Sequence, residues 1–171
     1  MQPNLLVTYE PAHGGKAMQE VKLFLEEAGE KVEFHDSGTD GVFFVSVGDA
    51  KQAVRHLVGL CSSSPERFRY TQRWIPVERW VSSDIDEMSS VMVEMNDRID
   101  DGEKWKIDIV KRGYDRYGTP ELIKTLTENI DRQHVDLKNP DKIVKVEIFG
   151  EKAAVALLNS DELLEVAKMK K

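Results

Sequence analysis

The chain has very little cysteine and no long apolar run, and each absence excludes a class of protein. Its 171 residues include one cysteine, Cys61, so no internal disulfide can form, and a lone thiol suits a reducing cytoplasm. Cys61 follows a leucine-rich helical stretch, and we expect a buried, inert thiol. No apolar run reaches the roughly 18 residues of a membrane span. The chain opens directly into the strand-like LLVTYE, so we expect no secretory signal and a cytoplasmic location.

The motifs of common enzymes are also missing. The sequence holds no phosphate-binding GxxxxGK[ST], no GxGxxG, no GxSxG and no CxxC. The Gly-Gly turn of His13-Gly14-Gly15-Lys16 is ordinary at a helix start, and an enzyme acting on nucleotides through it is the least favoured hypothesis. The four histidines stand singly, without zinc-ligand spacing. We therefore expect no catalytic residue, no metal and no cofactor.

The net charge of −7 is unfavourable for binding a polyanion, but the charge is unevenly distributed. Residues 82–103 hold eight acidic residues and one basic residue. Their net charge of −7 equals the net charge of the whole chain. Residues 65–81 are net +2 and residues 104–146 are net +3. The two basic segments are where a phosphate backbone could be held.

Hydrophobic periodicity predicts an α+β protein of two domains. Residues 1–82 follow a βαββαβ order, the pattern of a ferredoxin-like domain. Its last strand, within 67–81, contains Pro76, which we expect at an edge or a bulge.

The second domain, predicted over 83–171, begins with an acidic helix that carries an apolar stripe from Ile85 to Ile99. An alternating strand starts at Trp105, and Thr119-Pro120 predicts a helix with Thr119 as its cap. Residues 142–149 and 153–158 predict a hairpin, because Val144, Val146 and Ile148 alternate with Lys145 and Glu147. A short helix is expected from Asp161.

Two basic segments carry interleaved aromatic residues. Lys111 to Gly118 brings cations and tyrosines to a helix start, a combination that suits a phosphate or an unstacked base. The alternative is an ordinary solvated surface of mixed charge. In the other segment, Arg67, Arg69 and Arg73 share one strand face, and they suit either phosphate recognition or ion pairs within the protein.

Several of these blocks together resemble the THUMP domain, an RNA-binding module of tRNA-modifying proteins. The most specific is VDLKNPDKIVKVEIFGEKAAVALL at 135–158; WKIDIVKRG at 105–113 and TPELIKTL at 119–126 resemble the preceding strand and helix. RFRYTQRWIPVE at 67–78 resembles the segment that leaves the small domain before many THUMP domains.

The resemblance implies a tRNA-binding adaptor that acts at the acceptor stem and 3′ end and is not itself an enzyme. It is most similar to the stand-alone group that assists a separate acetyltransferase in making tRNA N4-acetylcytidine. Since few residues follow the last block, we expect no catalytic domain downstream. The alternative is a protein-interaction module that uses acidic helix 84–101 and contacts RNA weakly. The RNA contacts implied by the resemblance are Arg73, Lys111, Arg112, Arg116, Lys138, Asn139, Lys142 and Lys145.

Overall fold

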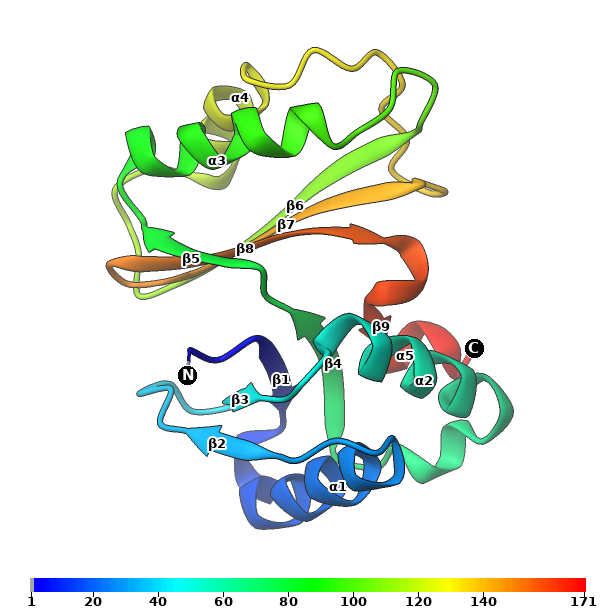
Figure 1. Ribbon diagram of the computed structural model, residues 1–171. Helices are drawn as coiled ribbons and strands as arrows, with labels where there is room; N and C mark the ends of the chain where they lie inside the picture. The colour runs from blue at the N-terminus through cyan, green and yellow to red at the C-terminus, as the bar shows by residue number, and fades with distance from the viewer. Residues whose placement is uncertain (1) are drawn as a thin grey trace. The chain divides into compact units, whose positions relative to one another are not determined.

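The computed structural model describes residues 2–171, and the chain divides into two compact units. The first runs to Val77 and includes Asp161–Lys171; the second is Glu78–Ser160. Each contains one sheet, and two helices pack on one face of the second sheet (Figure 1). The predicted mixed α and β architecture is confirmed. The predicted boundary at 82/83 placed residues 161–171 with the second domain, whereas here they return to the first unit.

The first unit has a five-stranded antiparallel sheet in the order β2-β3-β1-β4-β9. Its first six main elements follow the predicted βαββαβ order, and its assignment as ferredoxin-like remains a prediction. The strands are β1 (Leu5–Tyr9), β2 (Glu33–His35), β3 (Val42–Ser46), β4 (Thr71–Pro76) and β9 (Leu164–Glu165). The helices are α1 (Gly14–Glu27), α2 (Ala50–Ser63) and α5 (Val166–Met169), and single 3-10 turns form at Pro11–His13, Pro65–Arg67 and Ser160–Glu162.

Local sequence explains where these helices begin and end. In α1 the apolar residues recur at helical spacing and are buried against β1. The helix ends before Gly29, whose φ of 83° is the left-handed conformation that glycine adopts without steric cost. Asp49 caps α2 by accepting a hydrogen bond from the Gln52 N–H at 3.1 Å. Cys61 is fully buried in the same core, and burial raises the pKa of its thiol, as expected of an inert cysteine.

Pro76 lies at a strand end rather than inside one interrupted strand. It is the last residue of β4, and the chain then enters β5 (Arg79–Ser82), which belongs to the other sheet. The sequence predicted one strand over 67–81 interrupted at Pro76, and the structure instead has two strands that belong to different sheets. Proline cannot donate to a sheet ladder, so it suits the point where pairing in the first sheet ends.

The second unit has a four-stranded sheet in the order β5-β8-β7-β6, with α3 and α4 packed on one face (Figure 1). Strands β6 and β7 run parallel and are joined through α4, and β7 and β8 form the predicted antiparallel hairpin. Helix α4 starts at Thr119 itself, so the residue before its first turn is Gly118 and not, as predicted, Thr119. The elements are α3 (Ile85–Asp97), β6 (Trp105–Arg112), α4 (Thr119–Thr127), β7 (Lys142–Phe149) and β8 (Lys152–Asn159).

Candidate nucleic-acid interface

The carboxyl ends of the parallel strands β6 and β7 meet at one edge of the sheet. Arg112 ends β6 opposite Phe149, which ends β7. Each strand is followed by a turn at a glycine of positive φ, Gly113 at 63° after β6 and Gly150 at 61° after β7. The Gly150 N–H donates to the Arg112 carbonyl at 2.8 Å, which ties the two turns together. The loop after β6 therefore starts from a fixed position.

This loop, residues 113–118, carries exposed cationic and aromatic side chains into the start of α4. Lys111 donates through Nζ to the Tyr117 carbonyl at 3.0 Å and so closes the loop on its own strand. Arg116 is exposed and has no ion pair among the residues that the structure describes. No side chain caps α4, so the Thr119 and Glu121 N–H groups have no capping partner, whereas Pro120 has no N–H and the Glu121 carboxylate adds a negative charge to the same turn. A phosphate at this edge would meet the Arg116 guanidinium and these two N–H groups.

Tyr114 in the same loop is oriented inward. It packs against the core of the second unit, and burial raises the pKa of its hydroxyl, while nearby Arg116 partly opposes that rise. Tyr117 is 36% exposed and remains available to stack on a base. Of the two predicted aromatic residues in this loop, Tyr117 therefore faces solvent and Tyr114 supports the loop.

Lys138, Asn139 and Lys142 lie at the other end of the same strands. The loop that bears the first two is an Asx turn, in which Asp136 Oδ1 accepts from the Lys138 N–H at 3.0 Å and the Asn139 N–H at 2.9 Å. Both bonds lower the pKa of the Asp136 carboxyl, and the bond from the Asn139 N–H has the larger effect. The side chains of Lys138 and Asn139 are exposed. Lys142 is paired with Glu103 at 2.7 Å.

The two ends are separated by the length of β6. That strand has eight residues, which at about 3.3 Å per residue is roughly 25 Å. The predicted contacts in the second unit therefore form two separate groups rather than one patch. A stretch of RNA backbone of several nucleotides would be needed to touch both.

Lys145 is buried and lies within a row of alternating charges on the face of the sheet opposite α3 and α4. Its side chain is 2% exposed. Its Nζ lies 3.0 Å from Asp108 Oδ2 and 2.5 Å from Glu147 Oε2, and the other Glu147 oxygen accepts from Arg112 Nη1 at 2.8 Å. Lys145 therefore neutralises the buried Glu147 carboxylate and the partly exposed Asp108 carboxylate, and it has no surface to offer RNA. Arg112, whose guanidinium also lies 5.0 Å from the Phe149 ring centre, is largely committed to the same row.

Arg73, the eighth predicted contact, belongs to the first unit. It lies on β4, paired with Thr8 on one side and with Glu165 on the other, and is partly exposed. Exposed lysines that the prediction left out are Lys104, beside the Asx turn, and Lys124 on α4. Nothing in the sequence around these two lysines distinguishes them from ordinary solvated lysines.

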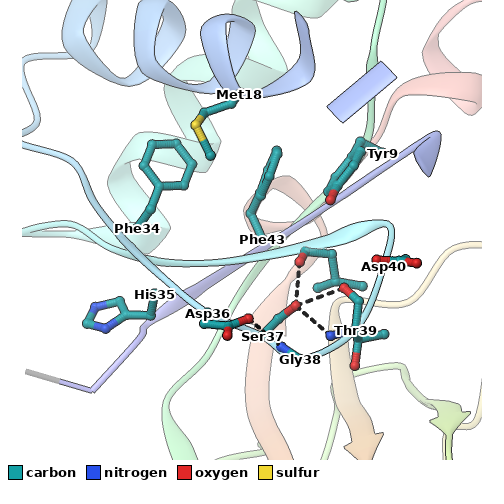
Figure 2. A pocket seen from close by; sticks show the side chains of 11 residues that line it. Tyr9, Met18, Phe34, His35, Asp36, Ser37, Gly38, Thr39, Asp40 and Phe43 are labelled. Carbon is teal, nitrogen blue, oxygen red and sulfur yellow. Dashed lines mark hydrogen bonds between the residues drawn. The ribbon is translucent and has the colours of Figure 1, made fainter. Parts of the chain in front are cut away.

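A pocket in the first unit is a poor match for a polyanion. It measures about 570 Å³ and lies in the first unit between α1 and the loop after β2. Figure 2 shows Tyr9, Phe34 and Phe43 as its aromatic wall, with Asp36 and Asp40 on the loop. Tyr9 and Phe43 are stacked at 4.1 Å. Its lining includes no lysine or arginine, and its two carboxylates, Asp36 and Asp40, would repel a phosphate.

Residues 2–171 contain neither a cluster of metal-ligating side chains nor a membrane-spanning helix. No group of three His, Cys, Asp or Glu side chains is placed to hold a metal ion. None of the described helices is long and apolar enough to cross a bilayer.

Comparison with known proteins identifies the second unit. Residues 82–158 match the family model of the THUMP domain, so the chain contains a THUMP domain, as predicted. A relative, an uncharacterised protein of Methanocaldococcus jannaschii, is 25% identical over 103 residues, which are 58% of this chain and 29% of that protein. The chain thus spans less than a third of the curated relative it matches.

Solved structures share the fold over most of the chain. PH1313 from Pyrococcus horikoshii aligns with a TM-score of 0.66 and 17% identity over 92% of this chain and 55% of its own. TrmN from Thermus thermophilus aligns with a TM-score of 0.56 and 18% identity, over 90% of this chain and 44% of its own. A 4-thiouridine synthetase solved with RNA and ATP aligns with a TM-score of 0.53 and 16% identity, over 96% of this chain and 42% of its own. At these identities the likeness shows the fold alone.

Proposed function

We propose that this protein binds tRNA through its THUMP domain, at the acceptor stem and single-stranded 3′ end. The observation that carries the proposal is the carboxyl edge of β6, where Arg116 and Tyr117 stand beside the uncapped start of α4. A cation, an aromatic ring and free N–H groups at one loop suit phosphate and unstacked bases. The solved neighbour that holds RNA adds support from outside the chain.

The role we propose is that of an adaptor, which presents tRNA to a separate modifying enzyme and performs no chemistry itself. The partner we favour is a tRNA cytidine acetyltransferase that makes N4-acetylcytidine. This finer proposal rests on the similarity of RYTQRWIPVE at 69–78 to the stand-alone group of THUMP proteins. Its test is reconstitution: acetylation of tRNA by that enzyme should require this protein and should fall with variants that lose tRNA binding.

The binding proposal is tested by titrating the full chain with bulk tRNA and with the same tRNA lacking its 3′ CCA, at two salt concentrations. We expect weaker binding to the trimmed tRNA. Arg116→Glu should lower affinity at low salt and reduce the slope of log affinity against log salt by about 1. Lys138→Glu makes the same charge change at the other end of β6, and Lys31→Glu makes it on the first unit. Equal binding to both tRNAs, or equal effects of all three variants, would contradict a site at the Arg116 edge.

Helix α3 supports a second candidate, docking of a basic protein partner. Two of its acidic side chains, Asp86 and Asp97, and that of Asp84 directly before it are exposed and have no ion pair within the described part of the chain. Glu94, by contrast, is paired with Arg79 at 2.7 Å. Exposed, uncompensated carboxylates on one helix repel RNA and attract cations, so this surface and the Arg116 edge suit different partners.

A further inference from the structure

The loop before β4 in the first unit has a conformation fixed by one buried carboxylate. Glu20 on α1, 8% exposed, accepts from the Arg69 N–H at 2.9 Å, the Tyr70 N–H at 3.2 Å and the Thr71 N–H at 2.8 Å. It also accepts from the Thr71 hydroxyl at 2.6 Å, and that hydroxyl in turn accepts from Nε1 of the buried Trp74 at 3.0 Å. The backbone is therefore set before any ligand arrives.

Tyr70 projects from this fixed loop between two open pockets. One, of about 420 Å³, is also lined by Lys16 and Leu23; the other, of about 220 Å³, is lined by His13 and Arg69. Lys16 Nζ lies 5.7 Å from the Tyr70 ring centre, and the His13 ring lies 5.6 Å away at 51°. The ring thus has free space beside it and cationic groups around it.

The charges around Tyr70 are unevenly compensated. Arg67 is paired with Glu27 at 2.9 Å, and Lys170 donates to the Phe68 carbonyl at 2.7 Å. Lys16 and Arg69 are exposed and form no ion pair with any residue from 2 to 171. The acidic residue that lines the smaller pocket is Glu10, and the larger pocket is lined by Glu20, which is already bonded to the loop. Two unpaired cations therefore remain beside one aromatic ring.

We propose that Tyr70, Lys16 and Arg69 form a second RNA contact, in which an unpaired base stacks on Tyr70 and its flanking phosphates meet the two cations. Base stacking on an aromatic side chain next to lysine and arginine is how proteins hold single-stranded nucleic acid without reading its sequence. The inference rests on the proposed tRNA-binding function and adds a contact outside the THUMP domain. An acidic peptide is less well suited, because aspartate and glutamate side chains have no aromatic ring to stack in the space beside Tyr70.

The test uses the full chain and a short single-stranded RNA that contains 2-aminopurine, whose fluorescence is quenched by stacking. Tyr70→Leu should weaken binding about five- to a hundred-fold and remove the quenching. Tyr70→Phe keeps the ring and should bind within about twofold of the natural protein. Lys16→Glu and Arg69→Glu should lower affinity, whereas Lys31→Glu should not, because Lys31 follows the far end of α1, roughly 20 Å from Lys16.

Failure of this inference can be distinguished from failure of the proposed function. If Arg116→Glu weakens tRNA binding while Tyr70→Leu changes neither affinity nor quenching, the THUMP site stands and the Tyr70 site is refuted. If neither RNA binds the natural protein, both are refuted. Loss of binding to a polyglutamate peptide in Lys16→Glu, with RNA binding unchanged, would assign the surface to an acidic protein instead. Thermal unfolding of each variant shows whether it is folded.

Discussion

At the scale of single residues, Lys145 shows why a charge in the sequence does not locate a surface. The alternation of Val144, Lys145 and Val146 correctly predicted opposite faces, and the THUMP resemblance implied that Lys145 contacts RNA. Strand β7, however, lies between β6 and β8, and both of its faces are buried. The partner carboxylate of Asp108 comes from β6, and only the register of the two strands brings it to Lys145.

Removal of Lys145 should therefore affect stability and not RNA binding directly. Lys145→Met leaves Glu147 and Asp108 without their shared cation, and breaking a buried pair costs about 3–5 kcal/mol. Urea unfolding should show this loss, while the exposed Lys138→Met should change the free energy of unfolding by less than about 0.5 kcal/mol. Unchanged unfolding together with weaker tRNA binding in Lys145→Met would restore Lys145 as an RNA contact.

Lys142 is also paired with an acidic neighbour, Glu103, and the pair can be detected through the pKa of the Glu103 carboxyl. The hydrogen bond from Lys142 to Glu103, followed by that from the Asp100 N–H, lowers the pKa of the Glu103 carboxyl below its ordinary 4.5. A depressed carboxyl pKa contributes stability that is present above the ordinary value and is lost as the pH falls through the folded value. In Lys142→Met, we expect the Glu103 pKa to rise toward 4.5, and the part of the acid-dependent loss of stability that Glu103 contributes should shrink.

Carboxyl NMR titration measures this shift directly. The matched control is Lys138→Met, which removes an exposed lysine from the neighbouring loop and should leave the Glu103 pKa in place. A Glu103 pKa that is the same in the natural protein and in Lys142→Met would mean that the ion pair does not form in solution. Lys142 would then be free to bind phosphate.

At the scale of elements, the two left-handed glycine turns hold the candidate RNA loop in position. Gly113 has a φ of 63°, so a Cβ there is strained whatever space surrounds it. Gly113→Ala should lower the free energy of unfolding by about 1 kcal/mol or more and weaken tRNA binding, because the Arg116 loop starts from this turn. Gly102→Ala is the control, since its Cβ would meet no atom within 4 Å and its φ is not in the left-handed range. Equal unfolding curves for both variants would refute the argument.

Elements were predictable where local chemistry decides them, and contacts were not. The β7–β8 hairpin, the stripe of α3 and the order of elements in the first unit follow from periodicity and turn residues. The change of sheet at Pro76 and the return of residues 161–171 depend on pairing between distant strands, which no local pattern encodes. For the same reason, Glu20 gave no signal as the residue that organises Arg69 to Thr71.

At the scale of the whole molecule, the net charge of −7 opposes RNA binding over a range set by salt. Screening shortens that range from about 30 Å at 0.01 M salt to about 10 Å at 0.1 M. Exposed carboxylates on α3 should therefore weaken tRNA binding mainly at low salt. Asp86→Asn/Asp97→Asn should raise tRNA affinity roughly two- to fivefold at 0.01 M salt and much less at 0.15 M, because the removed charges act through the field and not by contact.

The same double variant separates the two candidate roles of α3. If the helix only contributes a repulsive field, reconstituted acetylation should be preserved or improved along with tRNA affinity. If α3 docks the partner enzyme, tRNA affinity should still rise while acetylation falls, because the partner loses two of its acidic contacts. Ser89→Asn/Ser90→Asn changes the same helix without removing charge and should leave both activities unchanged. A fall in tRNA affinity in the Asp86/Asp97 variant would contradict the electrostatic argument in either role.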